Sequence, residues 1–235
     1  MPTYLVLQNM QKPNEEYMVM QKRSWAAVLF SLFIALLLVE IIFKVPEASY
    51  WRPVFYCLII VPVAFILIYR FLIKEGIASY HDFGLTKNHI FKNAIIGISL
   101  GIASGIIAFI AARYYFNLNA FEERNMIFAI IAKSVAAPIW EEFVFRGIMF
   151  SSLLWILDWK KDWPQEKRIL WIGFSYTVIA VIFTFGHYGT SDLVIVYFAG
   201  IVDTAAFHLT RSLVAPIFTH SIYNLLQILL PAYMS

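Results

Sequence analysis

The sequence has few charged residues and a single cysteine. Of its 235 residues, 14% are charged and 61% are hydrophobic, and the mean hydropathy is +0.72. A water-soluble domain carries roughly 25% charged and 45–50% apolar residues, so this balance excludes a soluble fold and predicts a membrane-embedded one. No basic run with interleaved aromatic residues occurs, which argues against nucleic acid as a partner. Cys57 stands alone, which excludes a disulfide within the chain.

Most of the sequence consists of long apolar runs. A helix that crosses a bilayer needs about 20 apolar residues, so the runs predict an all-α, polytopic transmembrane bundle of about seven spans. We expect these spans at residues 25–43, 54–73, 94–112, 126–157, 169–187, 193–210 and 213–230. Residues 1–24 would then form an N-terminal cytoplasmic segment, and residues 25–235 a single transmembrane domain in contact with the lipid bilayer.

Residues 126–157 form a run that is longer than one ordinary crossing. As a continuous helix it would be about 48 Å long, against about 30 Å for the hydrocarbon core. We therefore expect either a tilted helix bent at Pro138 or a helix with a partly embedded extension. A single crossing places most lysines and arginines of the connections on the side of the N-terminus. Because positive residues collect on the cytoplasmic side, this predicts a cytoplasmic N-terminus.

Gly97, Gly101 and Gly105 recur every four residues in the expected span 94–112. Small residues at this spacing let another helix backbone approach closely. We interpret the repeat as packing within the bundle rather than as a dimerisation face.

Three charged residues interrupt the run 126–157, namely Glu141, Glu142 and Arg146. Each charge near the middle of a bilayer costs roughly 2.5–3.5 kcal/mol, or on the order of 7–10 kcal/mol together if they are left unpaired. Glu142 and Arg146 are four residues apart and share one helix face, so we expect an ion pair. Glu141 points about 100° away from Glu142, which leaves it available for chemistry. Charges that packing does not need predict a functional site.

Other polar residues occur in or beside the later expected spans. His187 follows Phe183 by four residues, and Asn224 follows His220 by four, one helical turn further on the same face. A carboxylate, two imidazoles and a carboxamide are sufficient to hydrolyse an amide. The carboxylate takes a proton from water, an imidazole assists, and neutral donors stabilise the developing oxyanion.

The motifs E-E-x-x-x-R, F-x-x-x-H and H-x-x-x-N follow one another in that order on separate expected spans. Together they resemble the three motifs of the CPBP intramembrane proteases. That family includes the CAAX prenyl endopeptidases and bacterial Abi-type proteins linked to bacteriocin processing and immunity. The resemblance covers about residues 80–230, and the stretch 211–224 matches the approach to the third motif especially well.

The resemblance implies an intramembrane endopeptidase of the bacterial cell membrane, with residues 25–235 as its catalytic domain. Its substrate would be a peptide or protein, such as a bacteriocin, a signalling peptide or a CAAX-like tail. By the family pattern, Glu141 and His187 would activate the attacking water, and His220 and Asn224 would bind the oxyanion. Structural support of the site would come from Glu142, Arg146 and Phe183.

The same residues allow a second chemistry, and the same motifs a second function. Glu141, His187 and His220 can equally form a zinc site, although the H-E-x-x-H helix of soluble zinc peptidases is absent. We favour water activation that requires no cofactor. The alternative function is a non-catalytic membrane immunity or binding protein; a small transporter would show inverted repeats, which the sequence lacks. Asp203 and His208 stand outside the motifs, and we interpret them as a structural pair or as reaching the membrane boundary.

Overall fold

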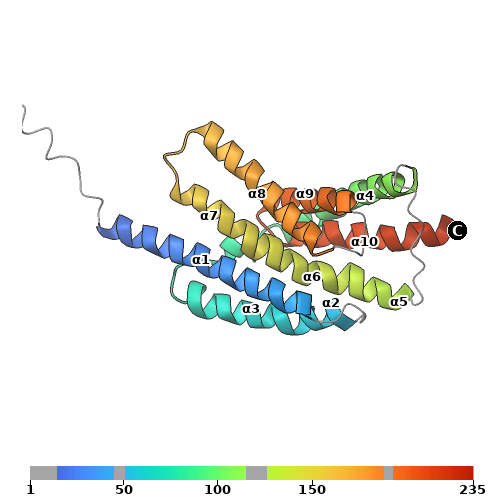
Figure 1. Cartoon of the computed structure of the whole chain (residues 1–235), viewed down its shortest axis with the longest axis horizontal. Coiled ribbons are helices and arrows are strands. Elements are labelled where there is room, and N and C mark those ends of the chain that lie inside the picture. Colours follow the sequence, from blue (N-terminus) through green and yellow to red (C-terminus); the bar gives the residue numbers. More distant parts are fainter. Residues whose placement is uncertain (1–14, 45–50, 115–125, 188–192, 235) are drawn as a thin grey trace, which may run out of the picture.

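The structure is a computed structural model that describes residues 15–44, 51–114, 126–187 and 193–234. Every regular element within these residues is a helix, which confirms the expected all-α class. Residues 1–14, the greater part of the expected cytoplasmic segment, lie outside the described residues. In chain order (Figure 1) the elements are α1 (Glu15–Lys44), α2 (Trp51–Phe55), η2 (Tyr56–Ile60), α3 (Val61–Ile68), η3 (Tyr69–Ile73), η4 (Tyr80–Phe83), α4 (Ile90–Tyr114), α5 (Met126–Ala129), η5 (Ile130–Ala136), α6 (Ala137–Glu142), η6 (Phe143–Phe150), α7 (Ser151–Trp159), α8 (Gln165–Phe185), α9 (Leu193–Thr210) and α10 (Val214–Met234).

Several helices have the length and composition of membrane spans. Four are found among the described residues: Pro53–Ile73, Ile90–Tyr114, Gln165–Phe185 and Leu193–Thr210. Two shorter apolar stretches, Arg23–Leu38 and Val214–Leu230, overlap the first and last expected spans. Four helices are therefore long and apolar enough to cross a membrane, and the full number of about seven spans stays a prediction. Helix α8 ends at Phe185, before the expected end at residue 187, so His187 lies in the turn that follows it.

The run 126–157 folds as one continuous helical stretch from α5 to α7, which ends at Trp159 (Figure 1). Two parts of it, η5 and η6, have wider turns than an α-helix. At the end of η5 the N–H of Ala137 donates to the oxygen of Ala132, five residues back, directly before Pro138. The proline ring cannot take part in an ordinary helical bond, and the wider turn accommodates it. The second wide turn begins directly after Glu142, so the paired glutamates lie between the two.

Helix α4 packs along α10 through its glycines. Gly97, Gly101 and Gly105 are buried. A Cβ atom built on Gly101 would lie 2.6 Å from the backbone oxygen of Thr219, and one on Gly97 would clash with the backbone oxygen of Ala215. Only glycine permits so close an approach. The interpretation as packing within the bundle is confirmed, and this contact positions the helix that carries the third motif.

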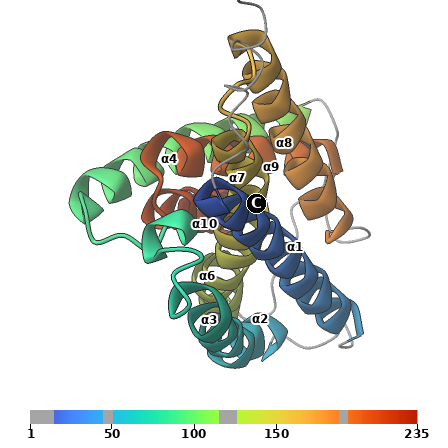
Figure 2. The same cartoon turned by 90° about the vertical axis from the view of Figure 1, so that its left-hand side faces the viewer.

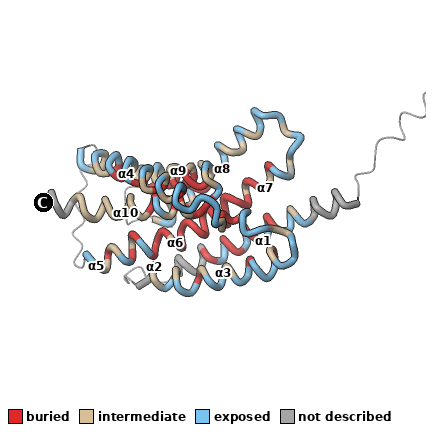
Figure 3. The backbone as a smooth tube through the Cα atoms, turned by 180° about the vertical axis from the view of Figure 1, so that it is seen from behind, coloured by how far each residue is buried: buried red, intermediate tan, exposed pale blue. Residues whose placement is uncertain are grey.

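The continuous stretch from α5 to α7, the long helix, lies in the middle of the bundle, with α1, α8, α9 and α10 packed around it (Figure 2). Buried residues gather along α6, η6 and α7 (Figure 3), and all 8 residues of η6 are buried. The surrounding helices expose apolar side chains on their outer faces; Ile107 is 67% exposed and Leu170 is 72% exposed. Glu141, Glu142 and Arg146 therefore face protein rather than lipid, as expected for functional charges in a membrane.

Candidate active site

Glu142 and Arg146 form the expected ion pair at the centre of the bundle. Arg146 Nη1 donates to Glu142 Oε1 at 2.8 Å, and both side chains are 0% exposed. The helical spacing of four residues brings the two groups together. The prediction of this pair from the sequence is confirmed.

Arg146 also joins the long helix to two of its neighbours. Its Nη2 donates to the backbone oxygen of Gly200 at 2.9 Å, and its Nε to Thr204 Oγ1 at 3.4 Å, both on α9. The guanidinium carbon lies 4.7 Å from the ring centre of Phe183 on α8, a cation–π contact. The planar fork of arginine, with five N–H donors, can make these contacts at once. One side chain therefore fixes α8 and α9 against the long helix.

Glu141 faces a different set of side chains. Its Oε2 lies 3.8 Å from Nε2 of His187 and 3.8 Å from Nε2 of His220. These distances exceed a hydrogen bond, and within the described part of the chain this buried oxygen has no hydrogen-bond partner. Polar atoms at this separation can be bridged by one water molecule. The structure thus brings together Glu141, His187 and His220, which come from α6, the turn after α8, and α10.

Hydrogen bonds on the far side of each ring determine which nitrogen faces Glu141. Nδ1 of His187 lies 2.9 Å from the backbone oxygen of Phe183, which can only accept, so this Nδ1 carries a proton. The four-residue spacing of F-x-x-x-H is the spacing of this bond. Nδ1 of His220 lies 2.8 Å from Glu142 Oε1, and an ionised carboxylate also only accepts. In both rings Nε2 is directed at Glu141, and a carboxylate beside imidazole rings is suited to general base catalysis.

Asn224 lies one turn beyond His220 on α10 and bonds to the long helix. Its Nδ2 donates to the backbone oxygen of Lys133 at 2.7 Å. Pro138, five residues further along, has no N–H to offer that oxygen, and the N–H of Ala137 bonds to Ala132. The side-chain amide of Asn224 therefore satisfies a carbonyl that the proline and its wider turn leave open. An amide nitrogen has a second N–H for another acceptor.

Asp203 and His208 do not form the structural pair that the sequence suggested. The Oδ2 atom of Asp203 lies 3.8 Å from Arg146 Nη2 and 3.8 Å from His220 Nδ1, and the residue is 2% exposed. His208 Nδ1 is instead hydrogen-bonded to the hydroxyl of Tyr176 at 3.1 Å. Asp203 stands outside the three motifs, yet it lies beside Arg146 and His220, because its partners are on other helices.

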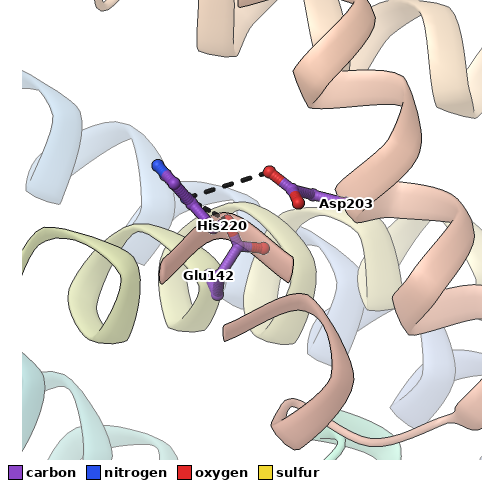
Figure 4. Close-up of side chains that lie close together, drawn as sticks. All are labelled: Glu142, Asp203 and His220. Carbon is purple, nitrogen blue, oxygen red and sulfur yellow. Dashed lines mark hydrogen bonds and ion pairs between the residues drawn. The ribbon is translucent and has the colours of Figure 1, made fainter. Parts of the chain in front are cut away.

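Asp203 approaches the site from α9, while its neighbours come from the long helix and α10. Figure 4 shows Glu142, Asp203 and His220 directed toward one another from these three elements. An isolated acid within an apolar run was the signal in the sequence that could have identified Asp203.

The structure also shows which side chains lie close enough together to share a metal ion. In the described part of the chain, one group of possible ligands has its donor atoms all within 4.8 Å of one another: Glu142, Asp203 and His220. The alternative set of Glu141, His187 and His220 does not form such a group. Ligands of a tetrahedral zinc each lie about 2.0–2.2 Å from the metal, so they are less than 4.8 Å from one another. In the first group, Arg146 Nη1 already lies 2.8 Å from the same Glu142 oxygen. Its positive charge opposes a second cation there.

A family model described as "Type II CAAX prenyl endopeptidase Rce1-like" matches residues 123–226, which include all three motifs. The resemblance to the CAAX protease family is confirmed. The matched region begins just before the long helix and ends within α10, so it contains every residue of the site. No curated protein and no solved structure matches the chain. The Rce1-like match and the four apolar helices together indicate an integral membrane protein related to peptidases.

Proposed function

We propose that the chain is an intramembrane endopeptidase that hydrolyses a peptide bond with a water molecule held by Glu141 and His187. The meeting of Glu141 Oε2 with Nε2 of His187 and of His220, each at 3.8 Å inside the bundle, carries this proposal. The match to Rce1-like endopeptidases supports the reaction class. A carboxylate beside two imidazoles in a bilayer is costly, and catalysis gives a reason to keep it there.

In the proposed reaction Glu141 is the general base. Its carboxylate takes one proton of the water as the water oxygen attacks the carbonyl carbon of the scissile bond. His187 accepts a hydrogen bond from the other water proton through Nε2 and so orients the attack. The carbonyl oxygen becomes an oxyanion, for which His220 and Asn224 are the proposed donors. When the C–N bond breaks, the proton on Glu141 passes to the leaving nitrogen and the carboxylate is restored.

The remaining motif residues are proposed to support the site. Glu142 accepts from both Arg146 and His220, so it links the ion pair to one of the histidines. Arg146 in turn holds α9 and lies over the ring of Phe183. No step of the proposed mechanism passes through a metal.

For the substrate we propose the tail of a peptide or protein. The Rce1-like match favours a CAAX-like tail, and bacteriocin or signalling peptides are the other members of the proposed class. Peptides with a C-terminal Cys-a-a-X sequence, made with and without a prenyl group, are therefore the first probes. Cleavage is followed by mass spectrometry of the released fragment.

The decisive variant is Glu141→Gln, which removes the proton acceptor and keeps the shape of the side chain. A general base contributes about 10²–10⁴-fold to the rate, so we expect cleavage to fall by at least about 100-fold. Glu166→Gln is the matched control, because the same change is made at an exposed position at the start of α8. A Glu141→Gln protein that is folded like the parent and cleaves at the parent rate would show that the site is not catalytic. The non-catalytic immunity or binding function would then explain the chain better.

A further inference from the structure

The hydrogen bonds of His220 conflict with its proposed role when the ring is neutral. Its Nδ1–H donates to Glu142 Oε1, at 2.8 Å. A neutral imidazole carries one proton, so its Nε2 would then be an acceptor. An oxyanion needs a donor. His220 can therefore donate through Nε2 only as an imidazolium, with both ring nitrogens protonated.

Acidic side chains surround His220 on both sides of its ring. Glu142 Oε1 and Asp203 Oδ2 lie 2.8 and 3.8 Å from Nδ1, and Glu141 Oε2 lies 3.8 Å from Nε2. Opposite charges at these separations attract each other far more strongly inside a protein than in water. Arg146 is the cation that contacts Glu142 and Asp203. Arg146 thus contacts two of the three acids, and a second proton on His220 adds a positive charge that faces the third, Glu141.

His220 and Asp203 are also shielded from water. They are 5% and 2% exposed, and the ring of Phe183 packs edge-on against the imidazole with ring centres 5.7 Å apart. Charges in such a place are compensated by one another rather than by solvent. The position of Asp203, 3.8 Å from both the Arg146 guanidinium and the imidazole, therefore matters for the state of both cations.

We propose that Asp203 is a further positioning residue of the site: together with Glu142 it holds His220 as an imidazolium whose Nε2–H donates to the oxyanion. Asp203 contacts neither the water nor the scissile bond and acts through His220. The donor role of His220 rests on the proposed peptidase function, whereas its protonation state does not.

The first test reads the protonation state without any catalysis. The full chain is labelled with ¹⁵N-histidine, placed in lipid nanodiscs, and studied by NMR at neutral pH. The chain has five histidines, so a His220→Gln protein assigns the signal. We expect both nitrogens of His220 to be protonated in the parent, and Nε2 to lose its proton in Asp203→Asn. A parent spectrum with one unprotonated nitrogen in His220 would overturn the proposal, and so would an imidazolium that persists in Asp203→Asn.

The second test is kinetic and uses the Cys-a-a-X peptides. Removing an oxyanion donor costs about 10²–10³-fold in kcat, so Asp203→Asn, which weakens one donor, should lower kcat by about tenfold or more. KM should stay within about twofold, because Asp203 contacts no substrate. Asp203→Glu, which restores a carboxylate, should recover most of the loss. Asp158→Asn, the same change at an exposed position of α7, should match the parent.

The outcomes separate this proposal from the peptidase function. An imidazolium in the parent that depends on Asp203, in a protein that cleaves none of the peptides, would support the protonation and remove the peptidase role. Full cleavage by Asp203→Asn would refute Asp203 as a positioning residue and leave Glu141 as the base. If Asp203→Asn does not fold, the parent spectrum and Asp203→Glu still decide the question.

Discussion

Replacing Gly101 by alanine tests whether the contact between α4 and α10 sets the geometry of the site. The new Cβ would lie 2.6 Å from the backbone oxygen of Thr219 and 2.8 Å from Cβ of Ile222, both on α10. Real Cβ contacts are essentially never shorter than 3.0 Å. Helix α10 must therefore move away by roughly 0.5 Å or more. Thr219 directly precedes His220, so the movement reaches the ring that faces Glu141.

Two opposing effects set the size of the loss in stability. Alanine is favoured over glycine within a helix by about 0.8–1.0 kcal/mol. Overpacking costs about 1–3 kcal/mol, and the upper part of that range applies because a backbone oxygen cannot rotate away as a side chain can. The free energy of unfolding should therefore fall by about 1–2 kcal/mol. A misplacement of about 1 Å can cost about 100-fold in rate, so the smaller movement of α10 should lower peptide cleavage by about tenfold.

Gly173→Ala is the matched control, because a Cβ at Gly173 on α8 would meet no atom within 4 Å. Thermal unfolding and cleavage of a Cys-a-a-X peptide are measured for both variants in the same detergent. For a chain of this size 1 kcal/mol corresponds to about 2–4 °C, so Gly101→Ala should unfold about 2–8 °C below the parent. Gly173→Ala should match the parent or be slightly more stable. If the two variants unfold at the same temperature and cleave at the same rate, the close contact of α4 with α10 does not exist as described.

Arg146→Gln should lower the free energy of unfolding by about 3–5 kcal/mol, because it leaves the carboxylate of Glu142 buried without its partner. Denaturant unfolding measures this loss, and Arg70→Gln is the control, since its exposed pair with Glu75 at 3.3 Å contributes about 1 kcal/mol or less. Similar losses in the two variants would contradict the burial of Arg146. Treatment with a chelator should leave cleavage unchanged, and elemental analysis should find far less than one zinc per chain, because no step of the proposed mechanism uses a metal and Arg146 opposes a cation beside Glu142. Loss of cleavage on chelation that added zinc restores would refute the metal-free mechanism.

The helices could be predicted from the sequence because apolar run length is a local property. The expected span 193–210 coincides with α9, and the run 126–157 is one helical stretch as far as Trp159. The expected end at residue 187 was too late, since a run of apolar residues does not show that the chain turns after Phe185. A helix ends where its backbone bonds end, and hydropathy does not report those bonds.

Individual contacts of the site could be predicted where both partners share a helix or a motif. The pair Glu142–Arg146 follows from a spacing of four residues and is confirmed at 2.8 Å. Asp203 meets Arg146 and His220 across helices, and no spacing within α9 contains that information. The bond of Asn224 to the long helix depends on a carbonyl that a proline leaves open, which the sequence showed only as an expected bend.

Stability does not account for the charges at the centre of this bundle. Replacing a buried network of ion pairs by apolar residues of similar volume is often neutral or stabilising by about 1–4 kcal/mol. Glu142, Arg146, Asp203 and His220 are each at most 5% exposed, and they hold one another from the long helix, α9 and α10. Leucines would join the same helices at lower cost in a bilayer. They could not turn one nitrogen of His220 toward Glu141 while a carboxylate binds the other nitrogen. That arrangement of a ring between two acids is what a reaction at Glu141 requires.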